Sequence, residues 1–285
     1  MVNGRCLCGE VTWQADGPLS EPEHCHCSMC RKIHAAPFAS FALCPEKQFR
    51  WLSGEDKVVR YASSPSLERP FCGTCGSALP NRDLPSGDVY LPLGNMEDDP
   101  GIKGGRHIFV ASKAPFVQIE DDLPRYDGFP PGDDETPPVD PAPVVPEPAE
   151  AGVMNGSCQC GAVAYEMTGA FQRVFNCHCS RCRHARAAAH ATNGFVPSAN
   201  LQFVRGEEHL KSYKRPDAKS FGQVFCGICG SGMPRENAAM QVYNVPLGTL
   251  DNDPEYVPDF HIFTESKAPW FDIHDQIPQL PEGPF

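Results

Sequence analysis

The feature that most constrains the fold of this chain is an internal repeat marked by cysteine clusters. Four motifs of the first part return later in the chain, two at an offset of 152 residues and two at an offset of 154. They are CLCG at 6–9 and CQCG at 158–161, CHCSMCR at 25–31 and CHCSRCR at 177–183, FCGTCGS at 71–77 and FCGICGS at 225–231, and HIF at 107–109 and 261–263. A period of that length indicates tandem duplication of a domain, because solenoid repeats are usually about 20 to 50 residues long.

The repeat divides the chain into three parts. We predict a first domain over residues 1–126, a linker over 127–152 and a second domain over 153–285. The linker is rich in proline and acidic residues, which favours an extended spacer over a packed element. The two additional residues of the second copy lie between Tyr213 and Phe225, which predicts a surface loop there.

The charge balance argues against an anionic partner. The chain has 24 Lys and Arg residues against 36 Asp and Glu residues, a formal net charge of -12 and a pI near 5.2. This balance disfavours binding to nucleic acid or to an anionic membrane surface. No stretch is long and apolar enough to span a bilayer, and the first residues lack the apolar core of a signal peptide. We therefore expect a cytoplasmic protein with no nucleic-acid or membrane partner.

Short strands dominate the expected secondary structure. Alternation of apolar and polar residues predicts strands at 11–15, 49–52, 58–61, 89–93, 107–110 and 163–167. The helical candidates follow the central cysteine cluster of each copy, near 29–35 and 180–189, and the second of them is rich in alanine. The predicted architecture is therefore mostly β, with very short helices.

Cysteine usage points to metal binding. The chain has 15 cysteines, which divide into seven in each copy and one more, Cys44. Disulfides are disfavoured because the count is odd, the chain is long and no export signal is visible. Cys44 aligns with Val196 of the other copy, which predicts an apolar core position for it. The other cysteines suit zinc, which prefers four tetrahedral ligands and accepts thiolates.

Seven thiols per copy divide most simply into a four-ligand site and a three-ligand site. Two short chelates from distant segments form a closed structural site. In this interpretation its ligands are Cys6, Cys8, Cys72 and Cys75 in the first copy and Cys158, Cys160, Cys226 and Cys229 in the second. The remaining clusters leave one metal position open, and they are Cys25, Cys27 and Cys30, and Cys177, Cys179 and Cys182. Up to four Zn2+ ions per chain are expected, although spacing alone leaves other pairings of the clusters, and purely structural sites, as alternatives.

Polar residues beside the three-cysteine clusters are candidates for supporting roles. His26 and His178 each lie between two cysteines, and we favour a supporting role for them over that of a fourth ligand. Cations that follow the cysteines could offset the charge of the site or bind a substrate carboxylate, and they are Arg31, Lys32 and Arg183.

The later repeated segments supply further candidates. Lys113 and Lys267 lie in a repeated Ser-Lys-Ala-Pro segment, where we favour a surface position over a pocket. His107 and His261 precede apolar pairs, so we expect hydrogen-bonded core histidines. The copies also differ at two aligned pairs, Phe38 with His190 and Phe41 with Asn193. If these positions face the pockets, the two sites differ in substrate or in competence, and His190 is a further candidate ligand of the second zinc.

These motifs resemble those of the glutathione-dependent formaldehyde-activating enzyme family, which also contains centromere protein V. The resemblance rests on CLCG at 6–9, CHCSMCRK at 25–32, FCGTCGS at 71–77 and HIFVASKAPF at 107–116, and it recurs in the second copy. It implies two tandem zinc-bound, β-rich, β-tent-like domains with a structural zinc on four cysteines and a second zinc on the CxCxxC cluster. The second copy departs from the common pattern at Arg183 and His184, which makes the transfer of activity to that copy less direct.

A zinc ion on three thiolates with an open position can bind an incoming thiol and lower its pKa. The resemblance implies that this small-molecule thiol is glutathione and that a carbon-sulfur bond is formed or cleaved, as in S-(hydroxymethyl)glutathione synthesis from formaldehyde. We therefore expect a carbon-sulfur lyase whose catalytic residues are the cysteines of the two CxCxxC clusters. The alternatives are a zinc-stabilised interaction module without catalysis and a small-molecule isomerase that reuses the open zinc site.

Overall fold

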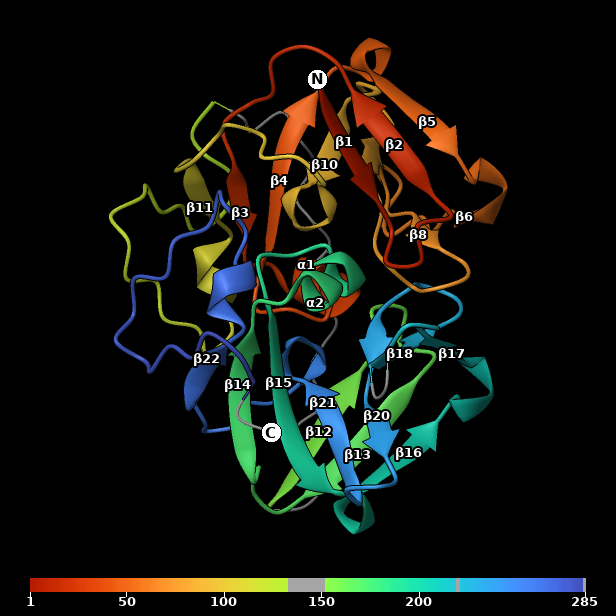
Figure 1. The fold of residues 1–285 in the computed structure, drawn as a ribbon, viewed down its shortest axis with the longest axis vertical. Helices are drawn as coiled ribbons and strands as arrows, with labels where there is room; N and C mark the ends of the chain where they lie inside the picture. The colour runs from red at the N-terminus through yellow and green to blue at the C-terminus, as the bar shows by residue number, and fades with distance from the viewer. Residues whose placement is uncertain (133–151, 219–220, 284–285) are drawn as a thin grey trace.

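The computed structural model describes residues 1–132, 152–218 and 221–283. We call residues 1–132 the first half and residues 152–283 the second half, and they form the upper and lower parts of the molecule in Figure 1. Most of the predicted linker, 127–152, lies outside the described residues, so its form and the domain boundaries stay predictions. None of the helices in the described ranges has the length and apolar character that crossing a bilayer requires.

Three sheets build the first half. Their strands are β1 (Val2–Arg5), β2 (Thr12–Ala15), β3 (Glu23–Cys25), β4 (Ala39–Cys44), β5 (Phe49–Ser53), β6 (Val58–Val59), β7 (Leu67–Glu68), β8 (Phe71–Cys72), β9 (Asn81–Asp83), β10 (Val89–Pro92) and β11 (Arg106–Ile108). The sheet orders are β1-β2-β5, β11-β3-β4-β10-β9-β7 and β6-β8. Strands β11 and β3 are parallel, whereas the other pairs are antiparallel.

The second half repeats this plan. Its strands are β12 (Val153–Ser157), β13 (Ala164–Thr168), β14 (Arg173–Cys177), β15 (Ala191–Pro197), β16 (Leu201–Arg205), β17 (Leu210–Lys214), β18 (Gly222–Cys226), β19 (Gly232–Met233), β20 (Arg235–Asn237), β21 (Val242–Pro246) and β22 (Phe260–Ile262). Their orders are β12-β13-β16, β20-β21-β15-β14-β22 and β17-β18-β19, and β22 again runs parallel to β14. The mostly β fold of two tandem β-rich halves is confirmed.

Short helices connect these strands. The described residues contain two α-helices, α1 (Ser28–His34) and α2 (Ser180–Arg186), which lie at the centre of Figure 1. The 3-10 helices are η1 (Glu46–Gln48), η2 (Glu55–Lys57), η3 (Leu93–Asn95), η4 (Val110–Ser112), η5 (Ser198–Asn200), η6 (Glu207–His209), η7 (Leu247–Thr249) and η8 (Thr264–Ser266). The expectation of very short helices is therefore confirmed.

The predicted strands form where alternation buries one face, as in β2, where Trp13 and Ala15 are fully buried. Two predicted strands are too long. The strand predicted at 58–61 ends at Val59, because the backbone beyond it pairs instead with residues 67–69. The strand predicted at 107–110 ends at Ile108, because Phe109 adopts a φ of 57° in the left-handed region.

The predicted helix at 180–189 is also too long. Alpha-helix α2 ends at Arg186, and Ala187 adopts a φ of 50°. Residues 187–189 are at most 1% exposed and pack against η3 of the first half, where a Cβ on Gly94 would lie only 2.0 Å from the nitrogen of Ala188. Packing between the halves therefore overrides the helix propensity of the alanines.

The halves contact each other reciprocally around a shared core. One buried cluster combines Ile33 and Phe116 of the first half with Tyr165 and other residues of the second. Helix α1 contacts η7 and α2 contacts η3, so each half offers the same elements to the other. This reciprocity is the contact pattern of an isologous dimer interface, formed here within one chain.

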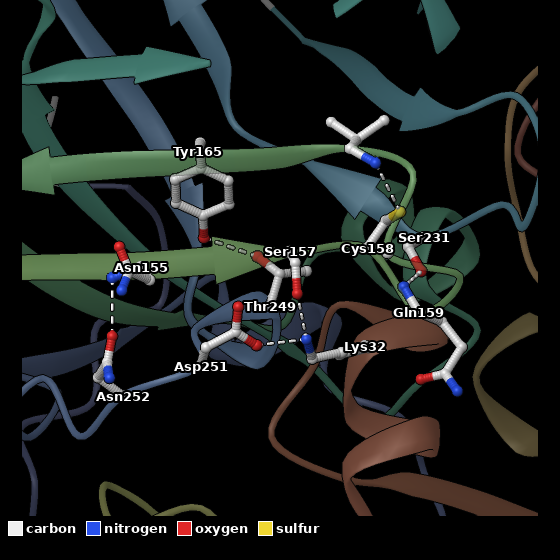
Figure 2. A network of polar contacts seen from close by, with 12 residues as sticks. Lys32, Asn155, Ser157, Cys158, Gln159, Tyr165, Ser231, Thr249, Asp251 and Asn252 are labelled. Atoms are coloured by element: carbon white, nitrogen blue, oxygen red, sulfur yellow. Dashed lines mark hydrogen bonds and ion pairs between the residues drawn. The ribbon is translucent and has the colours of Figure 1, made fainter. Parts of the chain in front are cut away.

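Lys32, a candidate to offset the charge of the thiols or to bind a substrate carboxylate, instead forms an ion pair at this interface. Figure 2 shows Lys32 of α1 between Ser157, at 2.5 Å, and the carboxylate of Asp251, with both ion-pair side chains 5% exposed. Lys32 therefore contacts the other half rather than the adjacent cysteines. The equivalent positions hold His184 and Glu97, with a nitrogen-oxygen distance of 3.2 Å and a Glu97 side chain that is 42% exposed.

Candidate metal centres

Two clusters of four thiols lie one in each half, and we call them the four-thiol clusters. Their members are Cys6, Cys8, Cys72 and Cys75 in the first half and Cys158, Cys160, Cys226 and Cys229 in the second, with all sulfur atoms of a cluster within 4.8 Å of one another. The Sγ–Sγ distance is 3.3 Å for Cys6–Cys8 and 3.7 Å for Cys8–Cys72. Each cluster connects the turn between the first two strands of its half to the turn after β8 or β18.

These distances fit a tetrahedral metal site. A zinc–sulfur bond of about 2.3 Å places two sulfur ligands about 3.8 Å apart, whereas a disulfide requires about 2.05 Å. In the second half the Cys158–Cys160 and Cys160–Cys226 distances are 3.5 and 3.9 Å, and all 15 cysteines, which lie in the described ranges, are free. Each four-thiol cluster can therefore hold a metal ion.

Two further clusters contain three thiols each, and we call them the three-thiol clusters. They comprise Cys25, Cys27 and Cys30 in the first half and Cys177, Cys179 and Cys182 in the second, again within 4.8 Å. Cys27 and Cys179 cap the N-termini of α1 and α2, and their sulfurs accept hydrogen bonds from the amides of Cys30 and Cys182 at 3.3 and 3.4 Å. Hydrogen bonds from Cys177 and Cys182 lower the pKa of Cys179 to about 3, so the arrangement favours a metal-binding thiolate.

Buried histidine chains adjoin the three-thiol clusters. Nε2 of His26 lies 2.8 Å from Nδ1 of His107, whose Nε2 lies 3.0 Å from the carboxylate of Asp121. The second half repeats this chain with the same two distances, through His178, His261 and Asp275. Because the carboxylate accepts the Nε2 proton of His107, the Nδ1 atom of His107 accepts the proton of His26.

This arrangement gives the histidines supporting rather than ligating positions. The ligand atoms that gather within 4.8 Å are the three thiols alone, and burial lowers the pKa of His26 to about 3. His107 and His261 are 4% and 2% exposed and hydrogen-bonded on both ring nitrogens. They are therefore core histidines, as their apolar neighbours predict.

The remaining charged candidates divide into arginines that lie near the thiols and lysines that do not. Burial lowers the pKa of Arg31 and of Arg183, an effect that the nearby Cys27 and Cys179 oppose, so both arginines lie within the field of the thiols. Lys113 and Lys267 instead donate hydrogen bonds to the carbonyls four residues later, at 2.5 and 2.6 Å. These lysines stabilise the turns that follow them.

The aligned differences between the halves fall in two different places. His190 lines a cavity of about 500 Å³ between the halves, where its ring packs edge-on against Phe38 at 5.8 Å. The structure therefore does not bring His190 to the second three-thiol cluster. Asn193 does line a pocket with that cluster, so the Phe41 and Asn193 difference changes the surroundings of the thiols.

The two three-thiol clusters differ in access. Cys25, Cys27 and Cys30 are each at most 6% exposed. In the second half, Cys179 and Cys182 are partly exposed and line a cavity of about 500 Å³ with Cys177. The second cluster can therefore be reached by a small molecule.

Side chains that differ between the halves explain this difference. In the first half the ring of Phe41 packs against His34 at 5.3 Å and against Tyr90 at 6.2 Å, and both Phe41 and Tyr90 pack in the cluster that surrounds the thiols. The positions equivalent to Phe41 and Tyr90 in the second half are Asn193 and Asn244, which line the cavity. In the first half, two aromatic rings thus fill the space beside the thiols, and in the second half two smaller amide side chains leave this space open.

Arginines near the thiols also differ. Arg69 is 4% exposed and its Nη1 lies 3.4 Å from Sγ of Cys30. Burial lowers the pKa of Arg69, but the charge of the nearby thiols outweighs this effect and raises the pKa above its usual value. The equivalent position in the second half is Gln223, and the cavity is lined there by Arg186 and Arg235. These arginines were not among the predicted site residues, although alignment of the repeats shows the exchange of Arg69 for Gln223.

Burial and like charge affect the two arginines of the second half. Burial lowers the pKa of Arg186 to about 10, the Cys182 thiolate opposes this shift, and the charge of Arg235 adds to it. Burial also lowers the pKa of Arg235, which Cys182 again opposes. The second three-thiol cluster therefore lies beside two closely spaced cations.

Comparison with known proteins identifies relatives of this chain. A curated relative from Schizosaccharomyces pombe, named an uncharacterised lyase, is 38% identical over 78 residues, which are 27% of this chain and 53% of that protein. The chain thus spans about half the length of that relative. A relative from Halomonas elongata, whose name assigns it provisionally to glutathione-dependent formaldehyde activation, is 28% identical over 133 residues, or 44% of this chain and 83% of that protein.

A solved structure and a family profile complete the comparison. The protein in a crystal structure from Rhodobacter sphaeroides is 28% identical to this chain, and the match covers 37% of this chain and 98% of that chain with a TM-score of 0.30. The family described as glutathione-dependent formaldehyde-activating enzyme matches residues 1–112 and 153–266. These segments contain all the cysteine clusters of both halves, and the chain belongs to the glutathione-dependent formaldehyde-activating enzyme family.

Proposed function

We propose that this protein is a zinc-dependent lyase that forms or cleaves the carbon-sulfur bond of a thiol adduct. The family and the names of the relatives support a lyase function related to glutathione and formaldehyde. The observation that carries the proposal is a three-thiol cluster at the wall of a 500 Å³ cavity. Three protein ligands are the number that catalytic zinc sites use, because they keep a fourth position for a small molecule.

The fourteen clustered cysteines are proposed to hold four Zn2+ ions. In each half the four-thiol cluster is the structural site, because it supplies all four ligands and joins two distant turns. The three-thiol clusters would hold the ions with the open position. The two domains are proposed to extend over 1–126 and 153–285, and the proposed partner is a small-molecule thiol, with glutathione as the family's substrate.

The proposed reaction needs neither an oxidant nor a reductant. When bound, zinc supplies a positive charge that lowers the pKa of a coordinated thiol. The thiol loses its proton, its sulfur forms a bond to the carbon of formaldehyde, and the electron pair of the carbonyl π bond moves to oxygen, which takes up a proton. The product is S-(hydroxymethyl)glutathione. Cys177, Cys179 and Cys182 would hold the zinc ion at the cavity wall and so determine where the substrate sulfur lies.

Exchange NMR with glutathione and carbon-13-labelled formaldehyde tests this proposal. Thiols add to formaldehyde without an enzyme, so the measured quantity is the exchange rate above the spontaneous rate. Zinc-loaded wild-type protein should accelerate exchange, Cys179→Ser should lose most of the acceleration, and Cys44→Ala should keep it, because Cys44 is a buried residue outside the clusters. A wild-type rate equal to the spontaneous rate would reject the proposed reaction.

A further inference from the structure

The cavity beside the second three-thiol cluster contains polar groups that the protein does not satisfy. Oδ1 of Asn193, Oδ1 of Asn244 and Nη1 of Arg186 are buried and have no hydrogen-bond partner in the part of the chain that the structure describes. All three residues line the cavity, and Asn193 is only 4% exposed. Unsatisfied buried polar atoms are uncommon and cost about 1–3 kcal/mol each. Their concentration in one cavity indicates a ligand that both donates and accepts hydrogen bonds.

The charges of the cavity indicate that this ligand is an anion. Within the described ranges, Arg186 and Arg235 form no ion pair with a carboxylate, although both line the cavity. Three thiolates and one divalent zinc ion would carry the same net charge in both halves. Two arginines, Arg31 and Arg69, lie near the thiols of the first half, and three, Arg183, Arg186 and Arg235, lie near those of the second. The second half therefore has one more positive charge than the first, which an anionic ligand would neutralise.

The shape of the cavity agrees with a small-molecule ligand. Its volume of about 500 Å³ lies within the range of about 300–1,000 Å³ that is typical of small-molecule sites. The same cavity exposes Cys179 and Cys182, so a ligand held by the arginines and amides can also present a sulfur to the thiol cluster. In the first half the aromatic rings of Phe41 and Tyr90 occupy the equivalent positions.

From these observations we infer that the chain binds one anionic, amide-bearing thiol, in the second half only. Arg186 and Arg235 bind its carboxylate, Asn193 and Asn244 bind its amide groups, and the first-half cluster is closed to substrate. This inference rests on the proposed function in taking the ligand to be the substrate thiol. It adds that the two metal sites of the three-thiol type have different roles and that four named residues select the substrate.

Isothermal titration of the zinc-loaded full chain with S-methylglutathione tests this inference without any turnover, because the thioether cannot add to formaldehyde. We expect one binding site per chain. Arg235→Gln should weaken binding at least tenfold, since a charge-assisted hydrogen bond is lost. Arg50→Gln, which changes an exposed arginine of the first half, should leave the affinity unchanged. S-methylcysteamine, which lacks both carboxylate and amide groups, should not compete.

A second variant tests the explanation for access. Asn244→Tyr introduces the residue of the first half, Tyr90, and should abolish binding while circular dichroism and zinc content stay those of the wild type. Two sites per chain, no binding at millimolar ligand, or unchanged affinity in Arg235→Gln or Asn244→Tyr would each overturn the inference. If binding weakens in Arg235→Gln and Asn244→Tyr but the wild type does not accelerate exchange in NMR, the inference stands and the proposed reaction is rejected. If exchange is accelerated but Arg235→Gln binds as tightly as the wild type, the proposed reaction stands and the inference is rejected.

Discussion

The ion pair between Lys32 and Asp251 should stabilise the protein much more than its counterpart across the same interface. Its side chains are each 5% exposed, so Asp251→Asn leaves the Lys32 ammonium group buried without a counter-charge. Removal of one partner from a buried ion pair costs about 3–5 kcal/mol. We therefore expect Asp251→Asn to lower the free energy of unfolding by about that amount.

The equivalent carboxylate provides a matched control. Burial lowers the pKa of His184 to about 3, so its contact with Glu97 joins a neutral ring to the carboxylate at pH 7. Glu97 forms its ion pair with Arg5, at 2.7 Å, and its side chain is 42% exposed. Exposed ion pairs contribute about 1 kcal/mol or less. Glu97→Gln makes the same change from carboxylate to amide and should cost less than about 1 kcal/mol. The double variant Lys32→Met with Asp251→Leu should regain most of the loss, because it removes both buried charges.

Urea unfolding of the zinc-loaded protein, followed by circular dichroism at pH 7, measures these differences. The variants should change the unfolding midpoint while the dependence on urea stays the same, since the surface exposed on unfolding is unchanged. A loss below about 1 kcal/mol for Asp251→Asn, or one no larger than that for Glu97→Gln, would refute the argument from burial.

Three further predictions concern packing, pH and metal. Gly94→Ala should cost about 1–3 kcal/mol and lower Tm, since its Cβ would lie 2.0 Å from the nitrogen of Ala188, whereas Gly128→Ala, with no atom within 4 Å, should be neutral. Burial, and then the charge of His261, lower the pKa of His190 to about 3 in the folded protein. As pH falls below about 6.5, His190 is therefore protonated in the unfolded chain before it is protonated in the folded protein. Stability due to neutral His190 is thus lost between those two pH values, and His190→Phe should reduce the slope of unfolding free energy with pH by up to about 1.4 kcal/mol per unit. Cys229→Ser should remove one of four zinc ions per chain in elemental analysis and lower Tm, and unchanged zinc content would contradict the proposed ligand set.

Residues close in sequence made the thiol clusters predictable. In C-x-C and C-x-x-C segments the spacing itself brings the sulfurs near one another, and the repeat indicated which segments belong together. Each expected cluster is present with its sulfurs within 4.8 Å. The strand that contains Trp13 was predictable for a similar reason, because a half-buried strand shows its alternation locally.

Features that depend on the contact between the halves were not predictable. The alanines at 187–189 favour a helix by themselves, and the packing of Gly94 from the other half ends it. Access to the thiols depends on side chains far apart in sequence, such as Asn193 and Asn244. Only the three-dimensional structure shows that these two residues share one cavity, although each differs visibly from its counterpart in the aligned repeat.

The reciprocal packing of the halves within one chain has a consequence for how the two sites can diverge. In a dimer of identical chains, every mutation changes both subunits. A substitution that opens one pocket therefore also opens the other and changes the packing of both subunits. Here a change such as Phe to Asn alters a single pocket and leaves its twin filled. Duplication within one polypeptide thus lets one copy keep its thiols closely packed while the lining of the cavity changes in the other copy.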